Sequence, residues 1–154
     1  MNIRRAQEKD LPRILELNNI ESKWGGKKEI GFFQKYMNIS FFSVIEDTEK
    51  VVGFLMAMDH DTDYDSINFL WFKDKFRKYY YIDRVIVDES VRRKGIAFML
   101  YKEVINKKGP MPLVAEVAIE PSNEGSVKFH DKVGFKEVET LTSDGKKVRM
   151  YYLD

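Results

Sequence analysis

The chain has 154 residues, 44% of them hydrophobic and 33% charged, and its formal net charge at pH 7 is +1. This size suits one domain with a substantial core, and the balanced charge argues against a nucleic-acid or anionic-membrane partner. Without cysteine the chain has no disulfide, no thiolate metal ligand and no cysteine nucleophile. Because the charged stretch Met1–Asp10 lacks an apolar signal core and no run is long enough to span a bilayer, we expect a cytoplasmic protein.

The first residues predict a strand followed by two helices. Asn2–Arg5 is the strand, and a helix is expected to begin after Asp10 with Pro12 in its first turn. The predicted apolar face of this helix comprises Leu11, Ile14, Leu15 and Asn18. A second helix is predicted over Lys27–Met37, with one stripe formed by Ile30, Phe33 and Met37.

The remaining elements alternate between strands and helices. Phe41–Glu46 and Lys50–Met58 are predicted to form a hairpin around a short polar turn. A short helix at Asn68–Lys78 and a strand at Tyr79–Val87 are expected to follow. The next elements are a helix at Arg93–Asn106, a strand at Leu113–Ile119 and a helix at Asn123–Val133. A final hairpin is formed by Lys136–Leu141 and Lys147–Leu153. This alternation implies partly parallel strands with helices on the faces of the sheet.

The stretch His60–Asn68 is acidic and rich in turn-forming residues. Its alternating Asp61, Asp63 and Asp65 could bind calcium, but the glycine and the terminal glutamate of an EF-hand loop are missing. We therefore expect a solvated loop and no metal site.

The segment Val85–Leu100 predicts an anion site, because an apolar strand runs into a basic turn and a helix follows at once. Free backbone N–H groups gather at such a helix N-terminus, and residues with small side chains let a ligand approach them closely. Neither the P-loop pattern nor the three-glycine dinucleotide pattern is present. The residues expected to bind the anion are Arg92, Arg93, Lys94, Gly95, Ile96, Ala97 and Phe98.

Two motifs resemble the GNAT superfamily of N-acetyltransferases. The first, Val85-x-Val87 followed by Arg92-x-x-Gly95-x-Ala97, resembles the acyl-CoA pyrophosphate loop of that family. The second runs from Asn123 through Ser126 and Phe129-His130 to Gly134-Phe135, and resembles the family's later Asn…Tyr…Gly-Phe segment. The pieces Asp65–Asn68, Trp71-Phe72 and Tyr81–Arg84 are similar to a bacterial branch of predicted acetyltransferases, a label that names no substrate.

The resemblance implies one acyl-CoA N-acyltransferase domain over residues 1–154, with an α/β (α+β) fold. Its central sheet is expected to be mixed, mostly antiparallel and six- to seven-stranded, flanked by about four helices, with a splayed parallel strand pair at the cofactor site. The implied reaction is transfer of an acetyl group from acetyl-CoA to a primary amine of a small molecule or peptide, by direct attack. A non-catalytic acyl-CoA sensor with the same fold is the alternative. Homodimers are frequent in the superfamily, although no residue here requires one.

The resemblance also implies roles for two segments of the cofactor site. The backbone of Val85, Ile86 and Val87 is expected to pair with the pantetheine arm and to direct an N–H group at the developing oxyanion. Asn123 and Ser126 are expected to contact the cofactor from the helical face that also carries His130. At the position of His130 the family usually has a tyrosine that protonates the leaving thiolate. A histidine can do the same, and the alternative is that its ring only packs or hydrogen-bonds.

Two carboxylates are candidates for the base or the amine anchor. Asp83 lies on the strand that leads into the anion loop, and Glu116 interrupts the apolar run Val114–Ala118. A charge inside an apolar strand needs a partner or a function. The alternative for both is a structural ion pair, for example with Arg84.

The choice of acceptor is expected to depend on Ser22–Phe42 and Asp59–Tyr79, which contain no motif. The acidic residues of the second segment favour a cationic amine. Aromatic residues in and after it could line an acceptor pocket, or form core as aromatic residues more often do. They are Phe69, Trp71, Phe72, Phe76, Tyr79, Tyr80 and Tyr81.

Overall fold

The computed structural model describes residues 1–21 and 26–154, so residues 22–25 of the expected acceptor segment lie outside the described part. The chain divides into two compact units, Met1–Asp59 with Ile82–Lys107, and His60–Tyr81 with Lys108–Asp154. Seven strands follow the order β1-β2-β3-β4-β5-β7-β6 in a mixed sheet, and β4 contributes to both units. Five α-helices are present in the described residues, as the chain-order prediction has them, and the predicted fold class is confirmed.

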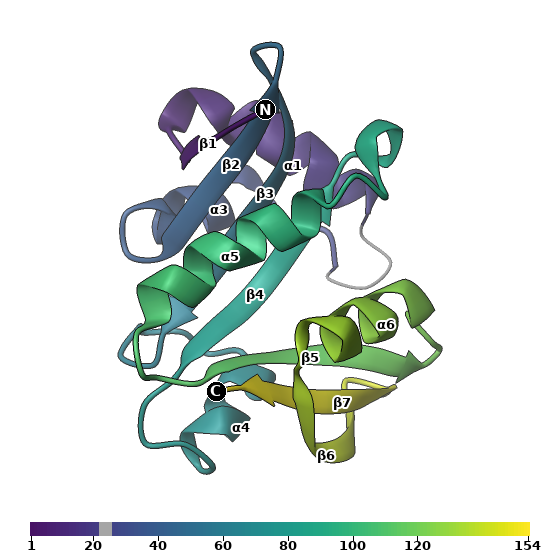
Figure 1. Cartoon of the computed structure of the whole chain (residues 1–154). Coiled ribbons are helices and arrows are strands. Elements are labelled where there is room, and N and C mark those ends of the chain that lie inside the picture. The colour runs from purple at the N-terminus through teal and green to yellow at the C-terminus, as the bar shows by residue number, and fades with distance from the viewer. Residues whose placement is uncertain (22–25) are drawn as a thin grey trace. The chain divides into compact units, whose positions relative to one another are not determined.

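The first unit is an antiparallel sheet with helices on both faces. β1 (Asn2–Arg5), β2 (Phe41–Asp47) and β3 (Lys50–Asp59) form a meander. Figure 1 shows α1 (Leu11–Ile20) and α3 (Ile30–Met37) on one face of these strands and α5 (Ile96–Lys108) on the other. Coverage of both faces explains why β3 is buried from Val51 to Met58, as a continuous apolar run predicts.

Short-range signals placed these elements correctly, with two differences on the helix faces. The β2–β3 hairpin turns at Thr48 and Glu49, whose φ angles of 51° and 65° match the turn that suits twisted strands. In α1 the predicted face residues Leu11, Ile14 and Asn18 are buried, but the fourth buried residue is Leu17, while Leu15 is only half-buried. In α3 Ile30 is exposed, because the helix begins at this residue and not at Lys27 as predicted.

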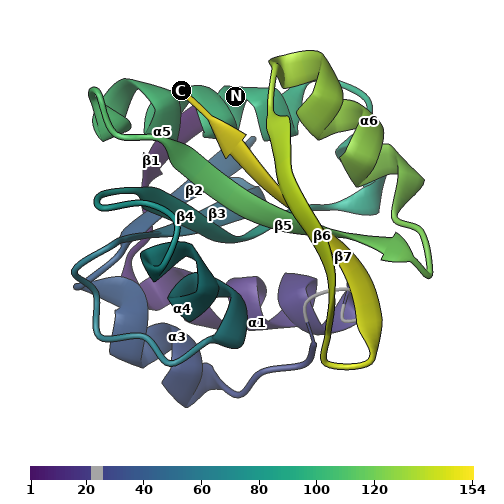
Figure 2. The ribbon, with the colours of Figure 1, turned by 90° about the horizontal axis from the view of Figure 1, so that it is seen from below.

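The second unit carries the parallel pair. β4 (Tyr80–Val87) pairs with β5 (Leu113–Glu120) through Tyr80↔Leu113 and Tyr81↔Val114 only, although each strand has 8 residues. Such a short ladder is what a splayed parallel pair predicts. β7 (Lys146–Leu153) lies antiparallel between β5 and β6 (Lys136–Ser143). Figure 2 shows α6 (Glu124–Val133) and α4 (Ile67–Lys73) on opposite faces of these strands.

Most of the aromatic run forms core. Phe69, Phe72, Tyr79 and Tyr81 are buried, and their rings contact one another at centroid distances of 5.5 to 6.1 Å. These residues therefore follow the core interpretation and not the acceptor-pocket one. The three others are partly exposed: Trp71, Phe76 and Tyr80. Over the described part of the chain, no helix combines the length and the apolar character that crossing a membrane requires.

Candidate active site

The basic loop between β4 and α5 differs from its prediction in one respect. The helix begins at Ile96, not at Arg93, because Arg93 and Gly95 have φ angles of 64° and 75° in the left-handed region. The first bond into the helix joins the Met99 N–H to the Gly95 carbonyl at 3.0 Å. The amides of Ile96 and the next two residues precede that bond and have no acceptor within the helix. A left-handed residue ahead of free amides forms a concave site for an anion.

Position 95 favours glycine because of its backbone conformation and not because a side chain would lack space. A Cβ atom built on it would find no described atom within 4 Å, so the space in front of the loop is open. Its φ of 75° is a conformation that other residues rarely adopt. The loop thus offers both the donors and the room that a diphosphate group needs.

The three basic side chains of the loop are not equivalent. Arg92 pairs with Glu21 and donates its Nε–H to the Val87 carbonyl at 3.3 Å. Its guanidinium therefore lies at the end of β4. Arg93 and Lys94 are exposed and supply positive charge at the surface of the loop.

Asp88 anchors the entrance to this loop, and the sequence analysis missed it. Its carboxylate accepts hydrogen bonds from the Ser90 N–H at 2.9 Å and the Ser90 hydroxyl at 2.8 Å, and it pairs with Arg13. These hydrogen bonds, the backbone N–H of Ser90 first, lower the pKa of Asp88 to about 2. The Asp88 N–H also donates to the Val52 carbonyl at 2.8 Å. The available signal was the Asp-x-Ser spacing, which is typical of a side chain that caps the turn following it.

The strand segment expected to meet the pantetheine arm comprises Val85, Ile86 and Val87, all half-buried. A neighbouring glycine on β3, Gly53, lets the two backbones approach. A Cβ at Gly53 would lie 3.0 Å from the Ile86 carbonyl oxygen and 3.6 Å from the Cα of Val87. Close backbone approach therefore holds this edge in place.

Asp83 forms an ion pair with Arg84, which is the structural alternative to a role as base. The Nε–H of Arg84 donates to the Asp83 carboxylate at 2.7 Å, and the two side chains are only 4% (Asp83) and 7% (Arg84) exposed. Glu116 has a different partner from the one suggested, since the Tyr81 hydroxyl donates to it at 2.8 Å. Asp83 belongs to the first unit and Glu116 to the second.

Helix α6 carries the other expected site residues. Asn123 is its N-cap residue, but its side-chain amide makes no capping hydrogen bond. One turn later, Ser126 contacts His130 twice: the Nδ1 of His130 lies 2.7 Å from the Ser126 carbonyl oxygen and 3.3 Å from its hydroxyl. Because a carbonyl oxygen only accepts, Nδ1 carries the proton in this bond.

His130 lies inside the second unit, with 3% of its surface exposed. Its ring stacks on Tyr151 at a centroid distance of 5.6 Å and an interplanar angle of 12°, and it makes a T-shaped contact with Phe135 at a centroid distance of 4.9 Å. The Tyr151 hydroxyl in turn donates to Asp131 at 2.8 Å. Burial lowers the pKa of His130, and the bond to Ser126 opposes that shift only in part.

This environment predicts a pH-dependent contribution of His130 to stability. The unfolded chain binds a proton near the ordinary pKa of about 6.5, whereas the folded protein disfavours the charged ring, so the unfolded state binds more protons in this range. The free energy of unfolding should therefore fall as the pH drops from about 8 to about 5. His130→Gln is expected to remove this contribution, at most about 1.4 kcal/mol per pH unit. Urea unfolding of both proteins across this range measures it; equal slopes would contradict a neutral buried ring.

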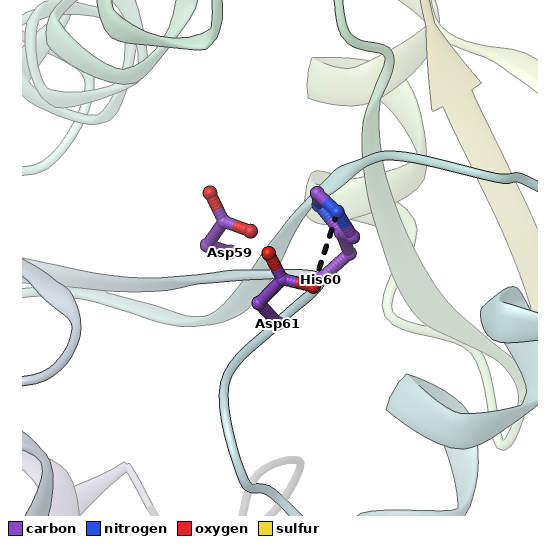
Figure 3. A group of neighbouring side chains, drawn as sticks. All are labelled: Asp59, His60 and Asp61. Carbon is purple, nitrogen blue, oxygen red and sulfur yellow. Dashed lines mark ion pairs between the residues drawn. The ribbon is translucent and has the colours of Figure 1, made fainter.

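Exposed and buried residues alternate in the acidic loop after β3. Asp61, Asp63 and Asp65 are exposed, while Thr62 and Tyr64 between them are buried. Figure 3 shows Asp61 with the two residues before it; its carboxylate pairs with the Nε2 of His60 at 3.3 Å and is 87% exposed. The three aspartates are thus solvated as expected, whereas the loop as a whole is not, since Thr62 and Tyr64 are buried.

A hollow of about 480 Å³ lies in the first unit, and no residue of the basic loop lines it. None of the expected site residues lines it. Its lining consists of Arg5, Ala6, Gln7, Glu8, Leu11, Gln34, Met37 and Asn38.

Comparison with known proteins agrees with the motifs. Residues 6–135 match the family model described as "Acetyltransferase (GNAT) family". No curated protein sequence matches the chain. Among solved structures, the chain is similar to an N-acetyltransferase from Staphylococcus aureus Mu50, with 27% identity, a TM-score of 0.76, and 99% of this chain and 97% of that chain covered.

Two further structures have the same fold. The first is smu.2055 from Streptococcus mutans UA159, with 22% identity, a TM-score of 0.77 and coverage of 100% of this chain and 99% of that one. The second is yncA, a putative acetyltransferase from Salmonella typhimurium with its cofactor acetyl-CoA, with 20% identity, a TM-score of 0.74 and coverage of 99% and 92%. Since the family match spans most of the chain and both motifs lie within it, this protein belongs to the GNAT family of acetyltransferases.

Proposed function

We propose that the protein, acting as one domain over residues 1–154, transfers an acetyl group from acetyl-CoA to a primary amine of a small molecule or peptide. The observation that carries this proposal is the loop before α5, where two left-handed residues precede amides without helical acceptors. A diphosphate fits such a loop because it offers several anionic oxygens to converging donors. Acetyl-CoA carries this diphosphate and supplies an activated acetyl thioester.

The reaction we propose is direct attack of the amine within a ternary complex. The N–H groups of the strand segment Val85–Val87 stabilise the negative charge that develops on the acetyl oxygen. Asn123 and Ser126 contact the cofactor from the N-terminal turn of α6. The side chain of Asn123, which makes no capping bond, supports its part in this assignment.

Two proton transfers complete the proposal. A free alkylamine resembles lysine, with a pKa of about 10.4, so a base or an anionic anchor must receive or offset its proton. Asp83 and Glu116 are the candidates, one in each unit. His130 is the proposed donor to the leaving thiolate. Its Nδ1–H is engaged with Ser126, so donation from Nε2 requires the doubly protonated ring. The burial that lowers the pKa of His130 disfavours that form and counts against this role.

The acceptor we propose is a cationic amine. The exposed carboxylates of Asp61, Asp63 and Asp65 support this choice, because they give the loop after β3 a negative surface. This argument names a charge class and not an individual molecule.

The alternative function is a non-catalytic acyl-CoA sensor, since the basic loop alone would serve either. Titration with acetyl-CoA in a calorimeter, followed by a thiol-release assay against a panel of diamines, amino acid amides and peptides, separates the two. An enzyme is expected to bind in the micromolar range and to release CoA thiol only when an accepted amine is present. Binding without turnover on any amine would favour the sensor, and no binding would reject both assignments.

A further inference from the structure

Arg84 is a buried cation on β4 that the proposed reaction does not use. Only 9% of the residue is exposed, in the strand segment between the candidate base Asp83 and the proposed pantetheine edge. A guanidinium in such a place needs several partners, because leaving it unpaired would be strongly destabilising. The identity of these partners indicates what the residue does.

Two polar partners bind the guanidinium from different elements. Its Nε–H donates to the Asp83 carboxylate at 2.7 Å, and its Nη1–H donates to the Asn18 side-chain oxygen on α1, also at 2.7 Å. Its Cζ lies 5.0 Å from the Phe32 ring centroid and 5.9 Å from that of Phe33, within range of cation–π attraction. The two hydrogen bonds thus fix the orientation of the guanidinium plane, and the contacts with the two rings fix its position.

Asn18 extends this contact to the segment that follows α1. Its Nδ2–H donates to the Gly26 carbonyl at 3.2 Å and to the Asn19 side-chain oxygen at 3.1 Å. Asn19 holds the backbone of Lys28 on both sides: its oxygen accepts from the Lys28 N–H at 3.0 Å, and its Nδ2–H donates to the Lys28 carbonyl at 3.1 Å. One chain of hydrogen bonds therefore runs from Asp83 through Arg84 to residues 26–28.

We propose that Arg84 is a positioning residue that couples the Asp83 carboxylate to the segment Gly26–Lys28. A single guanidinium orients the candidate base and, through Asn18 and Asn19, residues 26–28 of the stretch on which acceptor choice is expected to depend. Lysine cannot replace it, because an ammonium lacks the planar fork that reaches two partners in fixed directions. The coupling to catalysis rests on the proposed function, whereas the anchoring of residues 26–28 does not.

The experiment compares Arg84→Met and Arg84→Lys with a matched control, Arg5→Gln. Arg5 is exposed and donates to the Met37 carbonyl in the same unit. For Arg84→Met, the Lys28 amide should exchange with deuterium about tenfold faster or more, because the end of the hydrogen-bond chain is released. Its kcat/KM for the amine that the wild type uses best should fall about tenfold or more. Acetyl-CoA affinity should stay within about threefold of wild type.

Arg84→Lys separates positioning from folding. It is expected to recover part of kcat, since the ammonium can still pair with Asp83, while exchange at Lys28 stays fast and KM for the amine stays high. Unchanged Lys28 exchange in Arg84→Met would overturn the anchoring, whether or not an acceptor is known. Faster exchange with unchanged amine kinetics would make the contact purely structural and would also overturn the proposal. Failure of wild-type turnover on every amine would instead count against the proposed function.

Discussion

Replacing Gly95 with aspartate is expected to weaken acetyl-CoA binding by about 100-fold or more, because two effects act at the same position. The residue has a φ of 75°, so any side chain strains the backbone that shapes the loop. The new carboxylate also stands beside the amides at the start of α5, where it competes with the diphosphate for the same donors. Calorimetric titration of wild type and variant measures the loss.

The hairpin glycine Gly145 supplies a matched control. Its φ is 74°, and a Cβ there would also meet nothing within 4 Å, so Gly145→Asp introduces the same residue into the same backbone conformation. Both variants should lose similar stability, and only Gly95→Asp should lose binding. Equal affinity in the wild type and Gly95→Asp would show that the loop is not the diphosphate site.

Removing the charge of a candidate carboxylate is expected to lower the turnover rate by about 100-fold or more if that group acts as the base, and by about tenfold if it only anchors the amine. The variants are Asp83→Asn and Glu116→Gln, which preserve shape and remove charge. In Asp83→Asn the amide oxygen can still accept from Arg84, so the loss reflects charge more than geometry. In Glu116→Gln the bond from the Tyr81 hydroxyl can likewise persist. Thiol release at saturating acetyl-CoA gives kcat and the KM of the amine.

Glu103→Gln is the control for the carboxylate series, since Glu103 is exposed on α5. It should leave kcat and both KM values unchanged. If neither Asp83→Asn nor Glu116→Gln lowers the rate by about tenfold, neither carboxylate acts as the base or the amine anchor, and the amine loses its proton by another route. A rise in amine KM with unchanged kcat would identify an anchor and not a base.

Local patterns predicted most of the elements because the residues that specify them are neighbours in the chain. Apolar and β-prone runs bounded by turn residues located all seven strands, and the turns at Thr48-Glu49 and Asp144-Gly145 both have positive φ angles. The start of α5 was wrong by three residues. Helix propensity favours continuing through Arg93, but the loop puts that residue in the left-handed region.

The partners of the charged residues could not be predicted in this way. Arg84 meets Asn18, 66 positions away, and Glu116 meets Tyr81, 35 positions away. Each contact depends on where folding places two elements, and no spacing rule links residues so far apart. The same holds for Gly53, which reads as an ordinary interruption of a strand until the backbone of Ile86 lies against it.

The family, the fold class and the position of the basic loop between β4 and α5 could therefore be predicted from the sequence, since each depends on contiguous residues with their own backbone preferences. The tertiary structure decided the environments of the candidate catalytic groups. It buried His130 against Tyr151, which lowers the pKa of the imidazole, and it paired Asp83 with Arg84. Burial and pairing arise from the packing of distant segments, and they determine which group is charged and which can exchange a proton.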